Sequence, residues 1–228
     1  HPHIVRYRGC HHSRRRGVCN IMLEYVDGGS LGHVLRSRTR RGLGGFSEAQ
    51  VAAVVKQVLL GLQYLHQQQV IHRDLKPANL LVSRDGVVRI TDFDVSTQLN
   101  GLQAAARTVV GTPWYTSPEV IMVEPYSFRA DIWSLGCCAL ELSTGQCPYA
   151  GLGEVQAMFR MVQDAHPPLP DAASPALRDF LLQCWRRPAS ERPGASALLA
   201  HPFVRDVPDA PIPDLFGPQE GAEGAEGE

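Results

Sequence analysis

The chain has 228 residues, of which 44% are hydrophobic and 20% charged, so it can form one large globular domain or two small ones. Its net charge of −1 argues against a dedicated nucleic-acid-binding protein, because such proteins normally carry a basic surplus. Since no apolar run approaches the ~20 residues of a membrane-spanning helix, we expect no membrane span. The six cysteines form no C-x-x-C pair and show no zinc spacing, which favours reduced thiols in a cytoplasmic protein.

The first predicted elements are short strands. Apolar runs at residues 4–5 and 21–23 flank a polar, arginine-rich loop and predict the two strands of a hairpin. A turn at residues 27–30 then leads into a short helix. Four histidines lie in this region, and we interpret them as loop and strand-end residues rather than as a metal cluster; they are His1, His3, His11 and His12.

A long amphipathic helix is predicted to begin after residue 47. Ser47 and Gln50 fit a capping box, in which the serine caps backbone N–H groups and the glutamine reaches back. Apolar residues follow at helical spacing from residue 51 to residue 65. Lys56 falls inside this pattern, so we interpret it as a helix residue without a further role.

Residues 72–79 read His-Arg-Asp-Leu-Lys-Pro-Ala-Asn and carry the strongest functional signal. Phosphoryl transfer needs a carboxylate that receives or orients the attacking hydroxyl, a cation near the moving phosphate, and an oxygen ligand for magnesium. Asp74, Lys76 and Asn79 supply these three groups within six residues. The segment thus resembles the catalytic loop of a protein kinase, and the resemblance implies phosphoryl transfer.

The remaining elements are predicted from local signals. The sequence Asp85-Gly86 is a hairpin turn between two short apolar runs, and residues 130–144 form an almost wholly apolar helix that ends at Gly145. Ser174 and Pro175 begin a helix that runs to about residue 185, and a short helix follows near residues 195–199. From about residue 207 proline, glycine and glutamate dominate, which predicts a disordered acidic tail.

In this order the segments resemble a protein kinase over about residues 1–204. Residues 72–79 resemble the kinase catalytic loop, and residues 91–94 (Thr-Asp-Phe-Asp) resemble the magnesium-binding D-F-G motif with Asp94 in place of glycine. The resemblance implies an α+β, kinase-like fold that is mostly helical. Residues 1–26 would be a two-strand remnant of the small lobe, residues 27–204 the large lobe and residues 205–228 the disordered tail.

The resemblance also assigns catalytic roles and the cofactors ATP and Mg²⁺. Asp74 would orient the substrate hydroxyl, Lys76 would steady the γ-phosphate of ATP, and Asn79 and Asp92 would hold magnesium. We interpret Asp94 as a tolerated loop substitution that does not directly affect magnesium binding by Asp92.

Residues 23–26 resemble the hinge that binds adenine. By this resemblance the Glu24 carbonyl and the Val26 N–H would bond the adenine ring, and Leu81 would pack beneath it.

By the same resemblance, Arg73 would bind a phosphate in the activation segment, with Thr108 as the first candidate and Ser96 and Thr97 as weaker ones. A phosphothreonine brings nearly two negative charges, which can order a loop. Thr112 is expected to hydrogen-bond Asp74 and Lys76 rather than to be phosphorylated.

Three further residues are expected to be structural. By resemblance, Glu119 would pair with Arg192, and Asp131 would hold the backbone of the catalytic loop.

Lys76 after Asp74 and Leu75 suggests a serine/threonine kinase, and residues 25–31 and 94–96 resemble kinases of MAP kinase cascades. The tier stays open between MAP kinase kinases, which have dual specificity, the kinases one tier above them, and sterile-20-like kinases. The resemblance implies a protein substrate that is another kinase, and an upstream activating kinase.

The sequence departs from the kinase pattern at its beginning. It contains no G-x-G-x-x-G loop and no lysine ahead of the hinge, since Lys56 and Lys76 are its two lysines. We expect the chain to be a fragment of a longer kinase. The alternative is a truncated pseudokinase that acts as a protein-interaction scaffold.

Overall fold

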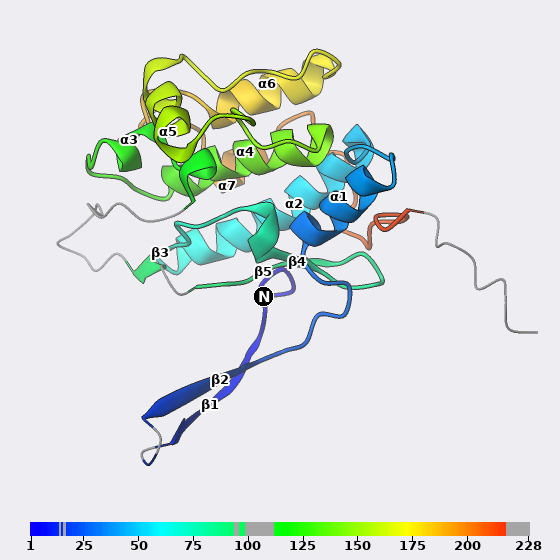
Figure 1. Ribbon diagram of the computed structural model, residues 1–228, viewed down its shortest axis with the longest axis vertical. Coiled ribbons are helices and arrows are strands. Elements are labelled where there is room, and N and C mark those ends of the chain that lie inside the picture. Colours follow the sequence, from blue (N-terminus) through cyan, green and yellow to red (C-terminus); the bar gives the residue numbers. More distant parts are fainter. Residues whose placement is uncertain (14, 16, 94–95, 99–111, 218–228) are drawn as a thin grey trace, which may run out of the picture.

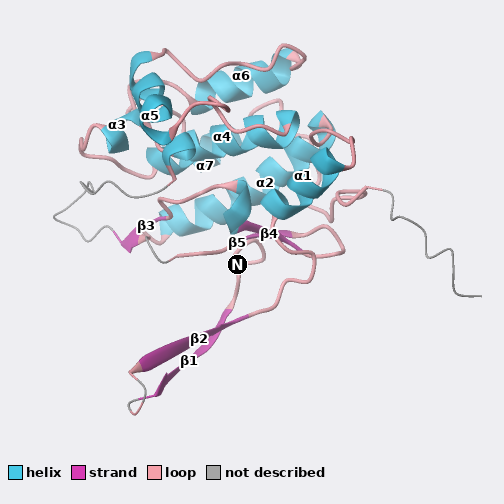
Figure 2. Ribbon diagram, in the orientation of Figure 1, coloured by secondary structure: helices cyan, strands magenta, loops and turns pink. Residues whose placement is uncertain are grey.

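The computed structural model describes residues 1–13, 15, 17–93, 96–98 and 112–217. Within these residues an N-terminal hairpin extends from a body made mostly of helices (Figures 1 and 2). The predicted α+β organisation, mostly helical with a two-stranded N-terminal part, is confirmed. Among the residues described, no helix has both the length and the apolar character needed to cross a bilayer.

The hairpin consists of β1 (Tyr7–Ser13) and β2 (Val18–Leu23), which pair antiparallel. The prediction of a hairpin is confirmed, but its first strand lies later in the chain than residues 4–5. Ile4 instead forms a parallel bridge with Ile90, and the Val5 N–H donates to the Ile90 carbonyl at 2.9 Å. Val5 is buried there, whereas the strands of the hairpin are almost wholly exposed, so residues 4–5 gain burial by pairing with the body.

Two helices follow the hairpin, α1 (Leu31–Arg40) and α2 (Glu48–Gln67). The predicted capping box is present, because the Gln50 N–H donates to Ser47 Oγ and the Gln50 side chain accepts from the Ser47 N–H. The apolar positions that give α2 its helical pattern are buried in the core; they are Val51, Val54, Val55, Val58, Leu59, Leu62 and Leu65.

The segment between α2 and α4 consists mainly of short strands, turns and 3-10 helices. β3 (Val70–Ile71) pairs with β6 (Thr97–Gln98), and β4 (Leu80–Val82) pairs with β5 (Val88–Ile90). The 3-10 helix η1 (Pro77–Asn79) leads directly into β4, and a second one, η2 (Pro113–Tyr115), precedes α3. The predicted turn between β4 and β5 is present, with Gly86 at φ +89°, a left-handed conformation that glycine adopts without strain.

The other helices form the upper part of the body in Figure 1, with α4 (Arg129–Thr144) buried at its centre. α4 packs against α2 and α6 (Pro175–Cys184), and η2 packs against α4 and α5 (Glu154–Gln163). The ends of α4 and α6 are as predicted, because Gly145 caps α4 at φ +81° and Ser174 caps α6. The short helices α3 (Pro118–Ile121) and α7 (Ala195–Leu198) complete the body.

The prediction of a disordered tail from residue 205 is wrong for residues 205–217. Ile212 and Leu215 are buried in the core, and the Ile212 N–H donates to the Gly86 carbonyl at 3.0 Å. Lys56 also has a role that the sequence did not reveal, because its Nζ donates to the Arg205 carbonyl at 3.2 Å. The backbone of this segment packs tightly on the β4–β5 turn, because a Cβ added at Gly86 would overlap the Ile212 backbone. This close contact, together with two buried side chains, holds the segment in place although it contains few apolar residues. Residues 218–228 lie outside the described residues.

Candidate active site

Asp74 is the centre of a group of polar side chains. Its Oδ1 accepts a hydrogen bond from Thr112 Oγ1 at 2.8 Å. Its Oδ2 lies 2.7 Å from Lys76 Nζ and accepts from Asn79 Nδ2 at 3.0 Å. Lys76 Nζ also donates to Thr112 Oγ1 at 2.7 Å. The structure thus brings together the three residues of the 72–79 motif, and Thr112 contacts both Asp74 and Lys76 as the sequence predicts.

Asn79 is held with its nitrogen toward the loop. Its Nδ2 donates to the Asp74 carbonyl at 2.8 Å as well as to the carboxylate, so the amide oxygen is the atom left to act as a ligand. The Asn79 carbonyl accepts the Thr91 N–H at 3.0 Å, which places the backbone before Asp92 next to Asn79. Asp92 itself is exposed and has φ +61°. An aspartate in this left-handed conformation is uncommon, and such residues cluster at functional sites.

His72 connects the two motif segments, a role that its sequence pattern did not predict. It is fully buried, and its Nε2 lies 2.8 Å from the Thr91 carbonyl. The Asp74 N–H lies 3.3 Å from His72 Nδ1. The tautomer with hydrogen on Nε2 satisfies both contacts, because Nδ1 then accepts while Nε2 donates. His72 therefore ties the backbone of the 72–79 loop to the segment that carries Asp92.

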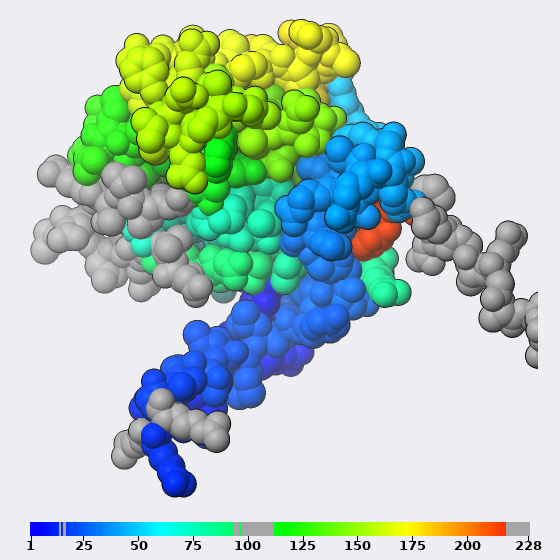
Figure 3. Space-filling view, in the orientation of Figure 1, coloured from blue at the N-terminus to red at the C-terminus, as the bar shows by residue number. Residues whose placement is uncertain are grey.

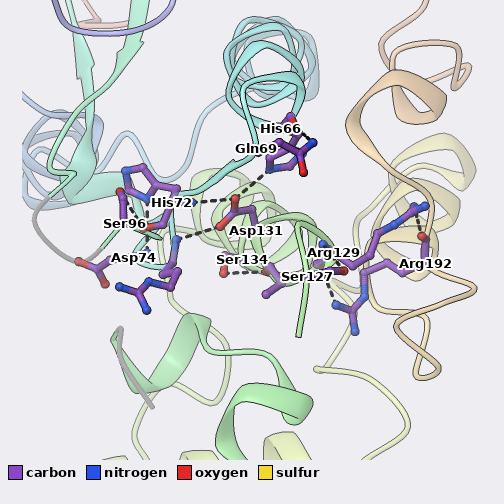
Figure 4. A network of polar contacts seen from close by, with 12 residues as sticks. His66, Gln69, His72, Asp74, Ser96, Ser127, Arg129, Asp131, Ser134 and Arg192 are labelled. Carbon is purple, nitrogen blue, oxygen red and sulfur yellow. Dashed lines mark hydrogen bonds and ion pairs between the residues drawn. The ribbon is translucent and has the colours of Figure 1, made fainter. Parts of the chain in front are cut away.

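Asp131, at the start of α4, holds this loop through its carboxylate, which lies beside His72 in Figure 4. Its Oδ1 accepts the Arg73 N–H at 2.9 Å, and its Oδ2 accepts the His72 N–H at 3.0 Å. A third contact comes from His66 Nε2 at 2.9 Å, which the sequence analysis missed. Arg73 adopts φ +71°, so the carboxylate stabilises a conformation that a non-glycine residue rarely takes.

The contacts of Asp131 also affect its ionisation. Burial alone would raise its pKa, but the hydrogen bond from His66, together with other contacts that include the Arg73 N–H, holds the pKa below the ordinary value of 3.8. A carboxylate whose pKa is lowered by folding stabilises the folded state at pH values above its ordinary pKa. This stabilisation is lost as the pH falls through the lowered pKa of the folded state.

Replacing Asp131 with asparagine is expected to lower the free energy of unfolding by about 1–3 kcal/mol, because the amide cannot accept from every backbone donor that the carboxylate serves. Urea denaturation near neutral pH measures the change. Since asparagine does not ionise, the difference from the parent should persist down to about pH 4 and shrink below it. The matched control is Asp179→Asn, whose exposed carboxylate contacts His201 at 3.0 Å. An equal loss in both variants would contradict the role of Asp131.

Glu119 and Arg192 form a buried ion pair. Arg192 Nη1 lies 2.7 Å from Glu119 Oε1, and Arg192 Nη2 lies 3.2 Å from Oε2, which is bidentate geometry. Arg192 is fully buried, and its guanidinium carbon lies 5.1 Å from the ring centroid of Trp133. The pair links α3 to the loop before α7, and it is the pair that the sequence predicts.

The expected adenine-binding residues lie where the hairpin meets the body. Glu24 donates its N–H to the Arg6 carbonyl at 2.9 Å, and its Oε1 lies 3.4 Å from Arg89 Nε in β5. Val26 is buried, and Leu81 in β4 is half-buried and bridges Ser30. Leu81 follows Asn79 by two residues, so β4 connects this region with the Asp74 group.

The expected regulatory contact is only partly described. Arg73 Nη1 donates to the Tyr126 hydroxyl at 3.4 Å, and Arg73 Nε is buried without a hydrogen-bond partner among the described residues. Thr108 and Asp94 lie outside the described residues. The described part of the chain contains no group of three or more potential metal-ligating side chains.

Comparisons with known proteins identify one protein family. Residues 1–204 match the family model for the protein kinase domain. MAP3K epsilon protein kinase 1 of Arabidopsis thaliana is 44% identical over 206 residues, which are 90% of this chain and 15% of that protein. Cytokinesis protein sepH of Emericella nidulans is 45% identical over 204 residues, which are 90% of this chain and 14% of that protein.

A further relative is mitogen-activated protein kinase kinase kinase 2 of Arabidopsis thaliana. It is 42% identical over 208 residues, covering 90% of this chain and 31% of that protein. The chain therefore spans less than a third of the length of each of these relatives.

Proposed function

The chain belongs to the protein kinase family, and from this we propose that it carries the phosphoryl-transfer centre of a serine/threonine kinase that acts in a MAP kinase cascade. The observation that carries the proposal is the group around Asp74, in which Lys76, Asn79 and Thr112 all contact one carboxylate. A phosphoryl-transfer centre works mainly by positioning and by electrostatic stabilisation. Both need side chains that the fold holds in place before substrate arrives.

Asp74 orients the hydroxyl of the substrate and accepts its proton. The carboxylate is fixed by three side chains and is therefore positioned in advance. Lys76 steadies the γ-phosphate, because its ammonium group lies beside the carboxylate that holds the attacking oxygen.

Asn79 and Asp92 fit a magnesium ion, since an amide oxygen and a carboxylate are the hard oxygen ligands that Mg²⁺ prefers. When bound, Mg²⁺ would neutralise charge on the phosphates of ATP. The hydrogen bonds from the Asn79 nitrogen to Asp74 support this assignment, because they keep the amide oxygen available. Adenine would bond the Glu24 carbonyl and the Val26 N–H, with Leu81 beneath the ring.

Arg73 binds a phosphate on Thr108 in the activated protein. The buried Arg73 Nε, without a hydrogen-bond partner among the described residues, supports this proposal because a phosphate oxygen would satisfy it. An upstream kinase would supply the phosphate, and the substrate would be another protein kinase. The upstream kinase and the substrate kinase would both be met in the cytoplasm, where we place this protein. The names of the relatives, which include the term MAP3K or mitogen-activated protein kinase kinase kinase, support these two partners.

Binding of Mg²⁺ and ATP tests this function in the protein of full natural length. ATP at 100 times its Kd should stabilise the folded kinase domain by about 2.7 kcal/mol, which corresponds to a rise in Tm of about 5–10 °C. The shift should fall when Mg²⁺ is omitted and in the Asp92→Asn variant. If Mg²⁺ and ATP together leave Tm unchanged, the proposed enzyme function fails, and a pseudokinase scaffold becomes the better account.

A further inference from the structure

The hairpin places two free cysteines against each other. Cys10 Sγ and Cys19 Sγ lie 2.9 Å apart, and both residues are exposed. In the register of the hairpin Cys10 lies opposite Ile21 and Cys19 lies opposite His12. Since side chains alternate between the two faces of a strand, Cys10 and Cys19 are diagonal neighbours on the same face.

We propose that Cys10 and Cys19 are a thiol pair that a low-molecular-weight disulfide, such as oxidised glutathione, converts reversibly into an intramolecular disulfide. This inference goes beyond the proposed kinase function and does not rest on it. A disulfide bond is about 2.0 Å long, so the two sulfur atoms need to approach by only about 1 Å. Closure combines rotation about the two Cα–Cβ bonds with a local adjustment of the exposed strands, because diagonal positions of a hairpin are spaced more widely than the cysteines of most disulfides.

The position of the pair gives an oxidant access. Figure 3 shows the hairpin standing out from the body of the molecule, and its strands are almost wholly exposed. The other cysteines differ in this respect, because three are buried and one is half-buried; they are Cys137, Cys138, Cys184 and Cys147. Burial raises the pKa of each of these four thiols. The pKa of Cys10 is raised as well, chiefly by its hydrogen bond with Cys19, so it is exposure to the oxidant that distinguishes the pair.

The reaction balances without any group from the enzyme site. The thiolate of one cysteine attacks oxidised glutathione, forms a mixed disulfide and releases one glutathione thiolate. The second thiolate then attacks the protein sulfur of the mixed disulfide and releases the other glutathione. The two cysteines lose two hydrogen atoms in total, and one oxidised glutathione becomes two reduced glutathione molecules.

Closing this bond would matter for the hairpin itself. An isolated two-stranded hairpin is marginally stable, and one that is exposed on both faces has a weakly specified register. The disulfide would fix the register of β2, the strand that leads directly into Glu24 and Val26.

The test incubates the natural protein with oxidised glutathione, blocks the remaining thiols with N-ethylmaleimide, and digests with trypsin without reduction. Trypsin cleaves after arginine, so peptides 9–14 and 17–36 contain the two cysteines separately. We expect these peptides to appear joined, with a mass two hydrogen atoms below their sum, and to separate after reduction. Cys147 serves as an internal comparison and should carry N-ethylmaleimide.

Single variants make the test decisive. In Cys10→Ser and Cys19→Ser the remaining cysteine lacks the second thiol that would resolve its mixed disulfide with glutathione. This mixed disulfide should therefore accumulate to about tenfold or more above its level in the parent. The proposal is overturned if the parent holds glutathione on either cysteine as the variants do, or if both cysteines react fully with N-ethylmaleimide. It also fails if the peptides are joined only in disulfide-linked dimers of the protein.

Discussion

Replacing Asp74 with asparagine is expected to lower kcat for phosphoryl transfer by about 10²–10⁴-fold, the usual loss when a positioned base is removed. Asparagine keeps the size of the side chain and can still contact Thr112 and Lys76, so the loop should keep its shape. It cannot accept the proton of the substrate hydroxyl, and the chemical step should therefore suffer. Initial rates with the protein of full natural length, ATP, Mg²⁺ and a protein substrate measure the change.

Two controls separate this loss from misfolding. Asp171→Asn removes an exposed carboxylate far along the chain from the catalytic loop and should leave kcat unchanged. The Asp74→Asn variant should also retain a rise in Tm with Mg²⁺ and ATP, because Asp74 is not assigned to either ligand. A variant that phosphorylates as fast as the parent would show that Asp74 is not the base.

Replacing Glu119 with glutamine is expected to lower the free energy of unfolding by about 3–5 kcal/mol, because the substitution leaves the Arg192 charge buried without a counter-charge. The size of the effect follows from burial, since Arg192 is fully buried and Glu119 is 6% exposed. Backbone carbonyls of Arg129 and Arg186 also accept from Arg192, but they carry no net charge to balance it. Urea denaturation followed by tryptophan fluorescence measures the loss.

The matched control is the exposed pair of Arg205 and Asp206, which lie 2.9 Å apart with side chains 58% and 75% exposed. Asp206→Asn should change the free energy of unfolding far less than Glu119→Gln does, because exposed ion pairs contribute little. If Glu119→Gln costs no more than Asp206→Asn, the buried pair is not the structural link inferred between α3 and the loop before α7.

Elements with a local signal could be predicted from the sequence. The capping box at Ser47, the glycine cap at Gly145 and the Ser174 cap of α6 depend on residues within one helical turn of each other. The pairing of Ile4 with Ile90 and the packing of Ile212 near Gly86 were missed. These contacts join residues far apart in the chain, and the composition of the 205–217 segment gives no sign of them.

In the candidate site, too, features with a local sequence signal could be predicted and long-range contacts could not. Short spacing in one motif was enough to indicate that Asp74, Lys76 and Asn79 act together. The contact of His66 with Asp131 and the two bonds of His72 depend on how the helices and strands pack, so the sequence did not reveal them. The left-handed conformations of Arg73 and Asp92 also lacked a signal, since glycine is the residue that usually marks such positions.

Transfer of labelled γ-phosphate from ATP is the measurement that tests the central claim most directly. The protein of full natural length would be incubated with Mg²⁺, labelled ATP and a mixture of protein substrates, and the products would be hydrolysed to phosphoamino acids. The account predicts label on serine or threonine that disappears with Asp74→Asn. Label on tyrosine alone, or no label although Mg²⁺ and ATP bind, would contradict it.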